Sequence, residues 1–349
     1  MNQSEIQSYR KAGNIAKQTA EYAKSIIRPG IKLLDIAEKI ENKIRELKGE
    51  LAFPVNLSIN EIAAHYTPSH DDQTTAQGLL KIDLGVSVNS YIADMAFSLD
   101  LENSPENKKL IQAAEAALNS ALKIVKPNIE LKQIGKVIQI EITKQGFSPI
   151  RNLSGHELGK NLIHAGLTIP NVDNGSDIKL PQGAFAIEPF STTGSGLVYD
   201  GKPSGIYKLQ EKKAIRDSLA RQILKFILEN YETRPFSQRE IIKKFGTKSL
   251  LSLKLLEQAG IIKQYPQLIE KNHKPVAQAE HTILVTDKVE VLTWEKTLCL
   301  LALSAFLALP SCTSANKNLK YTNAIATQPS QTCKREIKTP YGTKTIRTG

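Results

Sequence analysis

The chain has 349 residues, of which 41% are hydrophobic and 23% are charged, values that are ordinary for a soluble globular protein. Its net charge of +11 is unevenly divided: residues 294–349 carry eight Lys/Arg against two Glu, a net of +6, so the preceding residues carry +5. A net charge of +5 over residues 1–293 is only a weak indication of nucleic-acid binding. All three cysteines also lie in 294–349, which excludes a thiol nucleophile or a thiolate metal site in residues 1–293.

Four helices are predicted in the first half of the chain, because apolar side chains recur there at helical spacing. Each predicted helix ends at or shortly before a Pro or a Gly, which supports its boundary. The predicted helices span residues 4–28, 33–48, 105–125 and 130–145. A loop-and-strand stretch at 53–68 follows the second helix and precedes a pair of strands.

The pair of strands lies in 81–100, KIDLGVSVNSYIADMAFSLD, where two apolar, β-branched-rich runs flank the turn-forming residues 87–90. This pattern predicts a hairpin. Folding back at Val88-Asn89 brings Asp83 and Asp94, eleven residues apart, roughly opposite each other on neighbouring strands. Two ionised carboxylates held so close in a half-buried sheet repel strongly unless a cation lies between them. The alternative is one solvent-facing Asp and one that caps a turn.

A helix–helix–strand unit occurs twice in the chain. RPGIKLLDIAEKI at 28–40 matches KPNIELKQIGKVI at 126–138 at a shift of 98 residues. Asn-Leu-Ser at 56–58 likewise matches Asn-Leu-Ser at 152–154 at a shift of 96. Self-similarity over a whole unit predicts two halves related by a pseudo-twofold axis. Chance matching is the alternative.

The second half supplies its own pair of carboxylate-bearing strands: GAFAIEPFST at 183–192 carries Glu188, and QAEHTILVTD at 278–287 carries Glu280. The segment between them contains three predicted helices. Two span residues 212–230 and 248–259, and the third begins at the capping box Ser237-Gln238-Arg239-Glu240. These helices resemble a winged-helix module, so we expect a helical subdomain inserted at about 210–272. DNA binding is its weaker interpretation, because no basic, base-reading face is evident.

Two histidines, His156 and His164, lie in NLSGHELGKNLIHAGLTIPNV, between the first half and Glu188. A lone His in an apolar stretch is usually structural. Here, however, both strand pairs and the strand with His156 would converge on the pseudo-twofold axis. The residues that would meet there are Asp83, Asp94, His156, Glu188 and Glu280. Four carboxylates and one imidazole suit Mn²⁺, Fe²⁺ or Co²⁺, and by charge count two such ions, better than a thiolate-bound structural Zn²⁺. A water that bridges two such ions ionises near neutral pH and becomes a nucleophile.

Five motifs, in this order, resemble those of the type 2 methionine aminopeptidases in their compact archaeal-like form. They are FPVNLSINEIAAHYTP, KIDLGVSVNSYIAD, GHELGKNLIHAGLTIPN, EPF and AEHTILV. The resemblance covers about residues 3–292 and implies a catalytic domain over 1–292 with the α+β, pseudo-twofold pita-bread fold shared with Xaa-Pro peptidases. The helical insertion is a mark of type 2, since type 1 enzymes lack it.

The resemblance implies a role for each residue of the cluster. Asp83 would bind one metal ion, and His156 and Glu188 would bind the other. Asp94 and Glu280 would bridge both ions, which would be two divalent ions of Co, Mn, Fe or Zn. Glu188 would also be the general base that takes and relays the proton of the water.

The resemblance also implies residues that contact the substrate. His65 and His164 match two histidines, not metal ligands, that contact the scissile amide and stabilise the tetrahedral intermediate, where an imidazole can donate a hydrogen bond. The residues that match the pocket for the methionine side chain are Phe53, Ile163, Phe190 and Tyr265.

The implied activity is removal of the initiator methionine from nascent chains whose second residue is small. We expect a monomer, with nascent N-termini as substrates, the ribosome as a candidate partner and no specific DNA. The polar start MNQSEIQSYRKAG carries no signal peptide, so a cytoplasmic location is expected. One alternative is an Xaa-Pro dipeptidase, although those enzymes generally carry an additional N-terminal domain. The other is a non-catalytic ribosome- or RNA-binding relative, which the presence of all five ligand matches disfavours.

Residues 293–349 lie outside the resemblance. The stretch KTLCLLALSAFLALPSC at 296–312 is typical of a bacterial lipoprotein signal, with a Lys, an apolar run and Leu-Pro-Ser-Cys before polar residues. The apolar run is too short for a comfortable transmembrane helix. Our preferred hypothesis is a fused or misassembled reading frame without a role in catalysis, and the competing one is a peripheral membrane anchor. Residues 313–349 are predicted to be disordered.

Overall fold

The computed structural model describes residues 1–294, 334–339 and 342–347. Contacts within the chain divide it into two units, Met1–Thr297 and Leu298–Gly349, and each is described by itself. The first unit contains seven described helices, which are α1 Gln3–Ile26, α2 Leu33–Glu46, α3 Pro105–Ile124, α4 Leu131–Thr143, α5 Ser218–Asn230, α6 Gln238–Phe245 and α7 Ser249–Gln258. The four helices predicted in the first half therefore form close to their expected bounds.

Sixteen described strands belong to the same unit. They are β1 Glu50–Leu51, β2 Asn56–Ile59, β3 Ile62–Ala64, β4 Leu79–Val88, β5 Tyr91–Asp100, β6 Ser148–Pro149, β7 Ser154–Leu158, β8 Thr168–Pro170, β9 Gly183–Ile187, β10 Phe190–Thr192, β11 Val198–Leu209, β12 Phe236–Ser237, β13 Ile262–Glu270, β14 Val276–Gln278, β15 His281–Val285 and β16 Val289–Val291. One sheet has the order β16-β15-β9-β7-β8, and in another β4 pairs with β1, β2 and β5.

The predicted hairpin is formed by β4 and β5, with Asn89 and Ser90 at its turn. Both residues have left-handed φ angles, 52° and 74°, as a two-residue hairpin turn requires. Because this turn is centred one residue later than we expected, Asp83 lies opposite Ala96, two positions beyond Asp94. The two aspartates are therefore diagonal neighbours on one face of the hairpin, which agrees with the expectation that they lie roughly opposite each other and adds an offset of two positions.

The second strand pair is also formed, as the repeat predicts. β9 pairs antiparallel with β15, and β10 pairs with β14 in the same register. Glu188 follows β9 and Glu280 precedes β15, so the two glutamates face each other where both strands are interrupted. The two strand pairs then lie side by side through β5 and β15, where the backbone N–H of Glu280 donates to the carbonyl of Ala96 over 2.9 Å.

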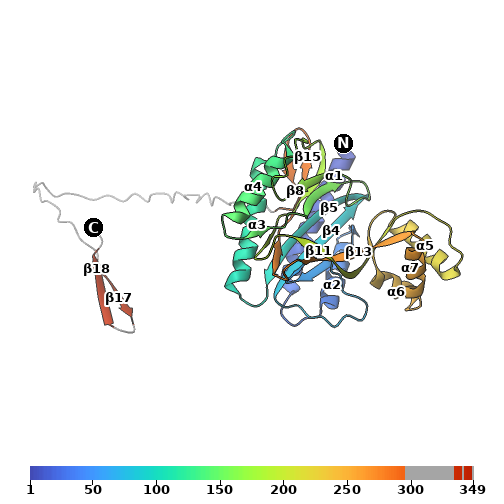
Figure 1. Cartoon of the computed structure of the whole chain (residues 1–349), viewed down its shortest axis with the longest axis horizontal. Helices are drawn as coiled ribbons and strands as arrows, with labels where there is room; N and C mark the ends of the chain where they lie inside the picture. The colour runs from blue at the N-terminus through green and yellow to red at the C-terminus, as the bar shows by residue number, and fades with distance from the viewer. Residues whose placement is uncertain (295–333, 340–341, 348–349) are drawn as a thin grey trace, which may run out of the picture. The chain divides into compact units, whose positions relative to one another are not determined.

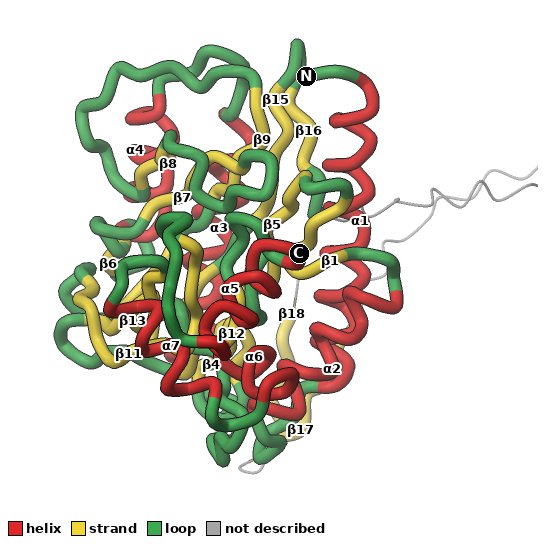
Figure 2. The backbone as a smooth tube through the Cα atoms, turned by 90° about the vertical axis from the view of Figure 1, so that its right-hand side faces the viewer, coloured by secondary structure: helices red, strands yellow, loops and turns green. Residues whose placement is uncertain are grey.

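Each half of the unit packs its own helix pair on its own strand pair, and α1 and α2 run along one side of the strands in Figure 2. A buried cluster between α1, α2, β4 and β5 includes Ile15, Ile36, Leu84 and Met95. The corresponding cluster between α3, α4, β9 and β15 includes Leu110, Ile134, Phe185 and Ile283. The two cores have the same arrangement, in agreement with the internal repeat.

The inserted segment forms a helical lobe of α5, α6 and α7, which lies at the opposite end from α3 and α4 in Figure 1. Its own core includes Ile223, Ile241 and Leu253. Ser237 caps α6 by accepting a hydrogen bond from the N–H of Glu240 over 3.2 Å, as expected. The Glu240 carboxylate, however, binds Arg45 and the hydroxyl of Tyr231, which ties the lobe to α2 instead of completing a capping box.

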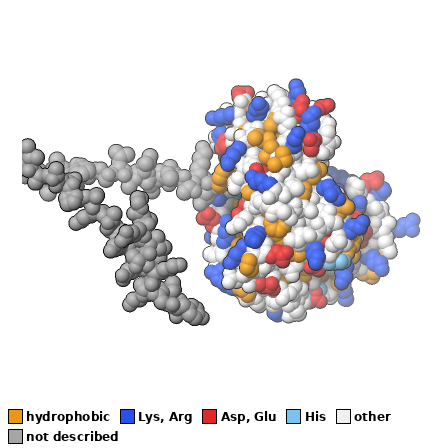
Figure 3. Space-filling model, turned by 60° about the vertical axis from the view of Figure 1, so that its left-hand side comes forward, with side chains coloured by type: hydrophobic (Ala, Val, Ile, Leu, Met, Phe, Trp, Pro, Cys, Tyr) orange, Lys and Arg blue, Asp and Glu red, His pale blue; other side chains and the backbone are white. Residues whose placement is uncertain are grey.

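In the second unit, β17 Lys334–Thr339 pairs antiparallel with β18 Gly342–Arg347. This pair differs from the disorder that we expected there, and the β-branched Ile and Thr of both segments favour strands. The predicted lipoprotein-like stretch at 296–312 lies outside the described residues. Among the described helices, none combines the length and the apolar character that a membrane span requires. Figure 3 shows side chains of both charges mixed over one face, with small apolar patches between them.

A buried ion pair fastens the inserted lobe to the first half. Arg239 on α6 and Glu41 on α2 are 2.6 Å apart, and each side chain is only 4% exposed. Glu41 also accepts a hydrogen bond from the N–H of Val55, and Arg239 donates to the carbonyl of Pro68. Burial raises the pKa of Glu41 despite the attraction of Arg239, so this carboxylate depends on its partner.

We expect Arg239→Met to lower the free energy of unfolding by about 3–5 kcal/mol, because it leaves the Glu41 carboxylate buried and unpaired. Urea unfolding of the purified protein would measure the change. The matched control is Lys243→Met on the same helix, whose pair with Glu38 is exposed and should contribute little. Equal unfolding midpoints for the two variants would contradict the role given to the buried pair.

Candidate metal centre

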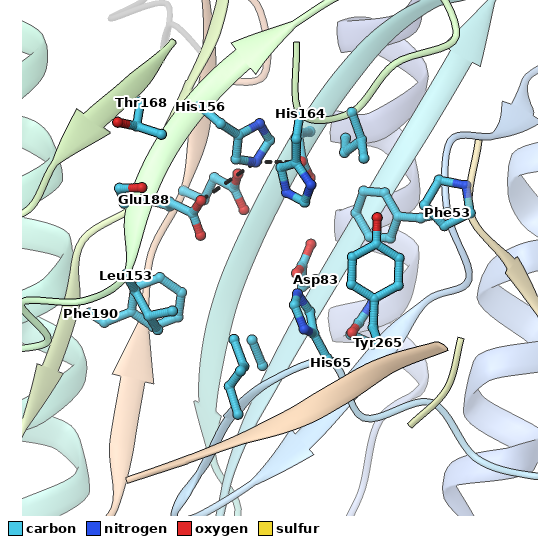
Figure 4. Close-up of a pocket in the computed structure, with 18 of the residues that line it drawn as sticks. Phe53, His65, Asp83, Leu153, His156, His164, Thr168, Glu188, Phe190 and Tyr265 are labelled. Carbon is cyan, nitrogen blue, oxygen red and sulfur yellow. Dashed lines mark ion pairs between the residues drawn. The ribbon is translucent and has the colours of Figure 1, made fainter. Parts of the chain in front are cut away.

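The residues predicted from the sequence converge on one cavity of about 400 Å³ at the junction of the two halves (Figure 4). All five predicted metal ligands, both predicted substrate-contacting histidines and all four predicted pocket residues line it: Asp83, Asp94, His156, Glu188, Glu280, His65, His164, Phe53, Ile163, Phe190 and Tyr265. These residues come from strands and loops between positions 53 and 280, so the cavity exists only in the folded chain.

Three of these residues form a compact group of potential ligands. Asp94, His156 and Glu280 each offer one atom, and these atoms lie within 4.8 Å of one another. Nε2 of His156 lies 3.6 Å from Oδ2 of Asp94 and 3.5 Å from Oε1 of Glu188. Asp83 is not part of the compact group, but its carboxyl group lies against that of Asp94 and faces the same cavity.

Local backbone structure explains how His156 reaches the carboxylates. It lies on β7, directly opposite Ala186 of β9, and two residues later the chain of β9 reaches Glu188. The preceding residue must be Gly155, because a Cβ there would lie 2.2 Å from the carbonyl oxygen of Ala186. The hydroxyl of Thr282 then holds the backbone of Asp94 against β15: it accepts from the Asp94 N–H and donates to the Asp94 carbonyl, each over 2.7 Å.

Burial dominates the electrostatics of the carboxylates. It raises the pKa of Asp83 to about 7. It also raises the pKa of Asp94, Glu188 and Glu280 well above the ordinary range, and the neighbouring negative charges add to the effect in each case. Without a cation, these groups therefore hold protons at a pH at which ordinary carboxyl groups are ionised.

The histidines respond to the same burial in the opposite direction. Burial lowers the pKa of His156 to about 3 and that of His164 to about 4, and it also lowers the pKa of His65. All three rings are neutral at pH 7, which is the form in which an imidazole nitrogen can bind a metal ion. The rings of His156 and His164 are packed edge to face, with centroids 4.5 Å apart.

The donor set fits divalent cations. Buried oxygens of Asp83, Asp94 and Glu280 have no hydrogen-bond partner among the described residues. A buried carboxylate oxygen without a partner is costly, and coordination of a cation removes that cost. Carboxylates with one neutral imidazole form an oxygen-rich set of the kind that binds divalent transition metals.

The predicted substrate-contacting residues lie around this group of ligands (Figure 4). His65 has a left-handed φ of 63°, and its Nδ1 lies 3.2 Å from the carbonyl oxygen of Pro266. Its ring packs edge to face on Tyr265 at 5.3 Å. Phe53 lies beside Tyr265 in Figure 4, whereas Phe190 lies across the cavity, so apolar side chains flank the ligands on two sides.

Two residues near the ligands were not identified from the sequence. Gln278 is 2% exposed, and its Nε2 donates to Glu188 over 3.4 Å and to Glu280 over 3.5 Å. Thr282 holds the backbone of Asp94, as described above. A signal was present, because Gln278, Glu280 and Thr282 are spaced two residues apart in the predicted strand QAEHTILVTD, a spacing that puts side chains on one face of a strand.

The raised carboxyl pKa values predict how metal binding depends on pH. A carboxyl group whose pKa is raised by folding stabilises the folded protein fully at a pH below its unfolded pKa, which is near 4. For Asp83 this stabilisation is lost as the pH rises through about 7. The buried histidines, whose pKa is lowered, make the folded protein less stable as the pH falls, but only below their unfolded pKa near 6.5. Between pH 6.5 and 8 the carboxyl groups therefore determine whether the stability of the metal-free protein rises or falls with pH.

We expect the melting temperature of the metal-free protein to fall from pH 6.5 to 8, and the increase produced by Mn²⁺ to grow over the same range. Thermal unfolding with and without Mn²⁺ measures both. Asp83→Asn, which removes one of these titrating groups, should flatten the first trend. An increase upon Mn²⁺ addition that shrinks with rising pH would contradict the expectation.

Comparisons with known proteins identify the family of the chain. The metallopeptidase family M24 matches residues 7–287. A methionine aminopeptidase of Methanocaldococcus jannaschii is 45% identical over 296 residues, which cover 83% of this chain and 99% of the relative.

Solved structures agree in fold. A thermophilic Arx1 has a TM-score of 0.72 at 19% identity and covers 84% of this chain and 93% of its own. A methionine aminopeptidase of Thermotoga maritima has a TM-score of 0.61 at 21% identity and covers 84% and 98%. The pseudo-twofold pita-bread fold and the metal dependence expected from the motifs are thereby confirmed. The chain belongs to metallopeptidase family M24, among the methionine aminopeptidases.

Proposed function

We propose that residues 1–292 hydrolyse the peptide bond after an N-terminal methionine when the second residue is small. The observation that carries this proposal is the compact group of Asp94, His156 and Glu280 at a cavity with apolar walls. A cavity of about 400 Å³ is large enough for a methionine side chain and a short stretch of backbone. Its size and lining favour a single apolar side chain next to the ligands.

We assign the ligands to two divalent ions of Mn, Fe, Co or Zn. Asp83 would hold one ion, His156 and Glu188 would hold the other, and Asp94 and Glu280 would be shared between them. The charge balance supports two ions, since two divalent cations offset four buried carboxylates. When bound, such ions supply an ionised water near neutral pH and polarise the scissile carbonyl. Gln278 supports the site by fixing Glu188 and Glu280 through its side-chain amide.

Glu188 is the proposed general base. One of its carboxylate oxygens lies 3.5 Å from Nε2 of His156, and the other accepts from Gln278. Burial and the charge of Asp83 raise its pKa. With ions bound, this carboxylate would accept a proton from the attacking water and then release it to the departing amine.

His164 and His65 have different proposed tasks. His65 faces the carbonyl oxygen of Pro266 with Nδ1, which assigns the ring hydrogen to Nδ1 and leaves Nε2 as an acceptor. It is suited to receive an N–H from the substrate. His164 is neutral and has one N–H to donate toward the oxygen of the tetrahedral intermediate. The four apolar lining residues, Phe53, Ile163, Phe190 and Tyr265, contact the methionine side chain.

The alternatives have less support. An Xaa-Pro dipeptidase is disfavoured by the high identity to a methionine aminopeptidase over nearly the whole relative. A non-catalytic relative is disfavoured by the complete set of ligands around one cavity. Nascent N-termini as substrates, ribosome contact, a monomeric state and a cytoplasmic location stay predictions from the sequence.

The function is tested by incubating metal-reconstituted protein with the peptides Met-Ala-Ser and Ala-Pro, each with and without a chelator. We expect release of methionine from Met-Ala-Ser, loss of this activity with the chelator, and no cleavage of Ala-Pro. Cleavage of Ala-Pro alone would show that the chain is an Xaa-Pro dipeptidase. Absence of any chelator-sensitive cleavage would contradict the proposed reaction.

We expect Glu188→Gln to lower kcat by at least about 10²-fold, the usual contribution of a general base. The amide keeps the shape of the side chain but cannot accept the proton from water. Turnover of Met-Ala-Ser under saturating Mn²⁺ measures the effect, and a variant at the exposed Glu102 serves as a control. A near-normal kcat would remove Glu188 from this role.

A further inference from the structure

We propose that Asn161, held between Ser90 and Thr233, is a positioning residue that sets the width of the methionine pocket. Asn161 is 4% exposed and has a left-handed φ of 52°. It lies in the loop 159–166, which connects the strand of His156 to the substrate-contacting side of the cavity. This proposal rests on the proposed function, because it assumes the roles given there to Ile163 and His164.

Asn161 makes three hydrogen bonds to two distant parts of the chain. Its backbone N–H donates to the carbonyl of Ser90 over 2.8 Å, and its side-chain amide donates to the hydroxyl of Ser90 over 3.0 Å. Its own carbonyl accepts from the hydroxyl of Thr233 over 2.6 Å. Ser90 belongs to the turn of the hairpin that carries Asp83 and Asp94, and Thr233 belongs to the inserted segment.

The network lies directly behind the wall of the cavity. Ile163 and His164, two and three residues after Asn161, line the cavity, and so does Pro235, two residues after Thr233. Ile163 is buried in the same cluster as Phe53. A shift of Asn161 therefore moves one apolar wall of the pocket and one histidine together.

The rest of the loop is fastened mainly to itself and to its own strand. Gly159 and Leu162 exchange backbone hydrogen bonds, and the N–H of Ala165 donates to the carbonyl of Glu157. Among the described residues, the hydrogen bonds from 159–166 to the hairpin turn and to the inserted segment all involve Asn161. The Thr233 hydroxyl is thus the polar contact through which the inserted segment reaches the loop.

Loss of this contact should reduce discrimination between side chains, because a pocket wall that is free to move accepts a branched side chain more readily. A general loss of folded protein cannot produce this result, since it lowers the activity on every peptide by the same factor. Discrimination therefore separates positioning from a merely structural role.

The experiment compares Met-Ala-Ser with Leu-Ala-Ser as substrates of metal-loaded protein. The variant is Thr233→Val, which keeps the shape and removes the hydroxyl, and Thr233→Ser should restore the wild-type behaviour. The matched control is Thr247→Val, at an exposed threonine of the same lobe. We expect the ratio of kcat/KM for the two peptides to fall about 3- to 10-fold in Thr233→Val only, the effect of one neutral hydrogen bond.

Ser90→Gly provides a second variant, because it keeps the left-handed turn and the carbonyl but removes the hydroxyl acceptor. We expect a smaller fall in the same ratio. Unchanged ratios in both variants, or equal changes in Thr233→Val and Thr247→Val, would overturn the proposal while leaving methionine release intact. If wild-type protein releases no methionine, the proposed function fails first and this inference fails with it.

Discussion

The main constraint on this structure is that four carboxylates, which repel one another, are buried within one cavity. Burial raises the pKa of each of them, and neighbouring negative charges add to the effect at Asp94, Glu188 and Glu280, so the metal-free site holds protons that ordinary carboxyl groups release. Unpartnered buried oxygens remain on Asp83, Asp94 and Glu280. Folding places these groups together at a free-energy cost, and cations are what offset that cost.

Two features of the backbone keep the carboxylates in place despite this repulsion. The hairpin turn at Asn89 and Ser90 sets the register of β4 and β5, and Asp83 and Asp94 become diagonal neighbours. Side-by-side packing of β5 and β15 then adds the second half of the site, through hydrogen bonds of the Glu280 backbone and the Thr282 hydroxyl. The repulsion is therefore opposed by the packing of both cores, each formed by a helix pair on a strand pair.

The inserted lobe completes the substrate side of the cavity. It contributes Tyr265 and Pro235 to the lining, and buried or partly buried polar contacts hold it against the first half. The Arg239–Glu41 pair fixes it to α2, while the hydroxyl of Thr233 reaches Asn161 behind the cavity wall. The lobe thus has a structural reason to influence specificity, even though it supplies none of the metal ligands.

The sequence by itself determined the helices, the two carboxylate-bearing strand pairs and the identity of the cavity residues. Helical spacing, turn chemistry and motif order are local properties of the chain. Only the tertiary structure decided the offset of Asp83 and Asp94, the support from Gln278 and Thr282, and the contact of Nδ1 of His65 with the carbonyl of Pro266. Each of these depends on contacts between residues far apart in the sequence, such as Asp94 with Thr282. Periodicity within a segment carries no information about which distant backbone group will lie beside it, because long-range packing makes that choice.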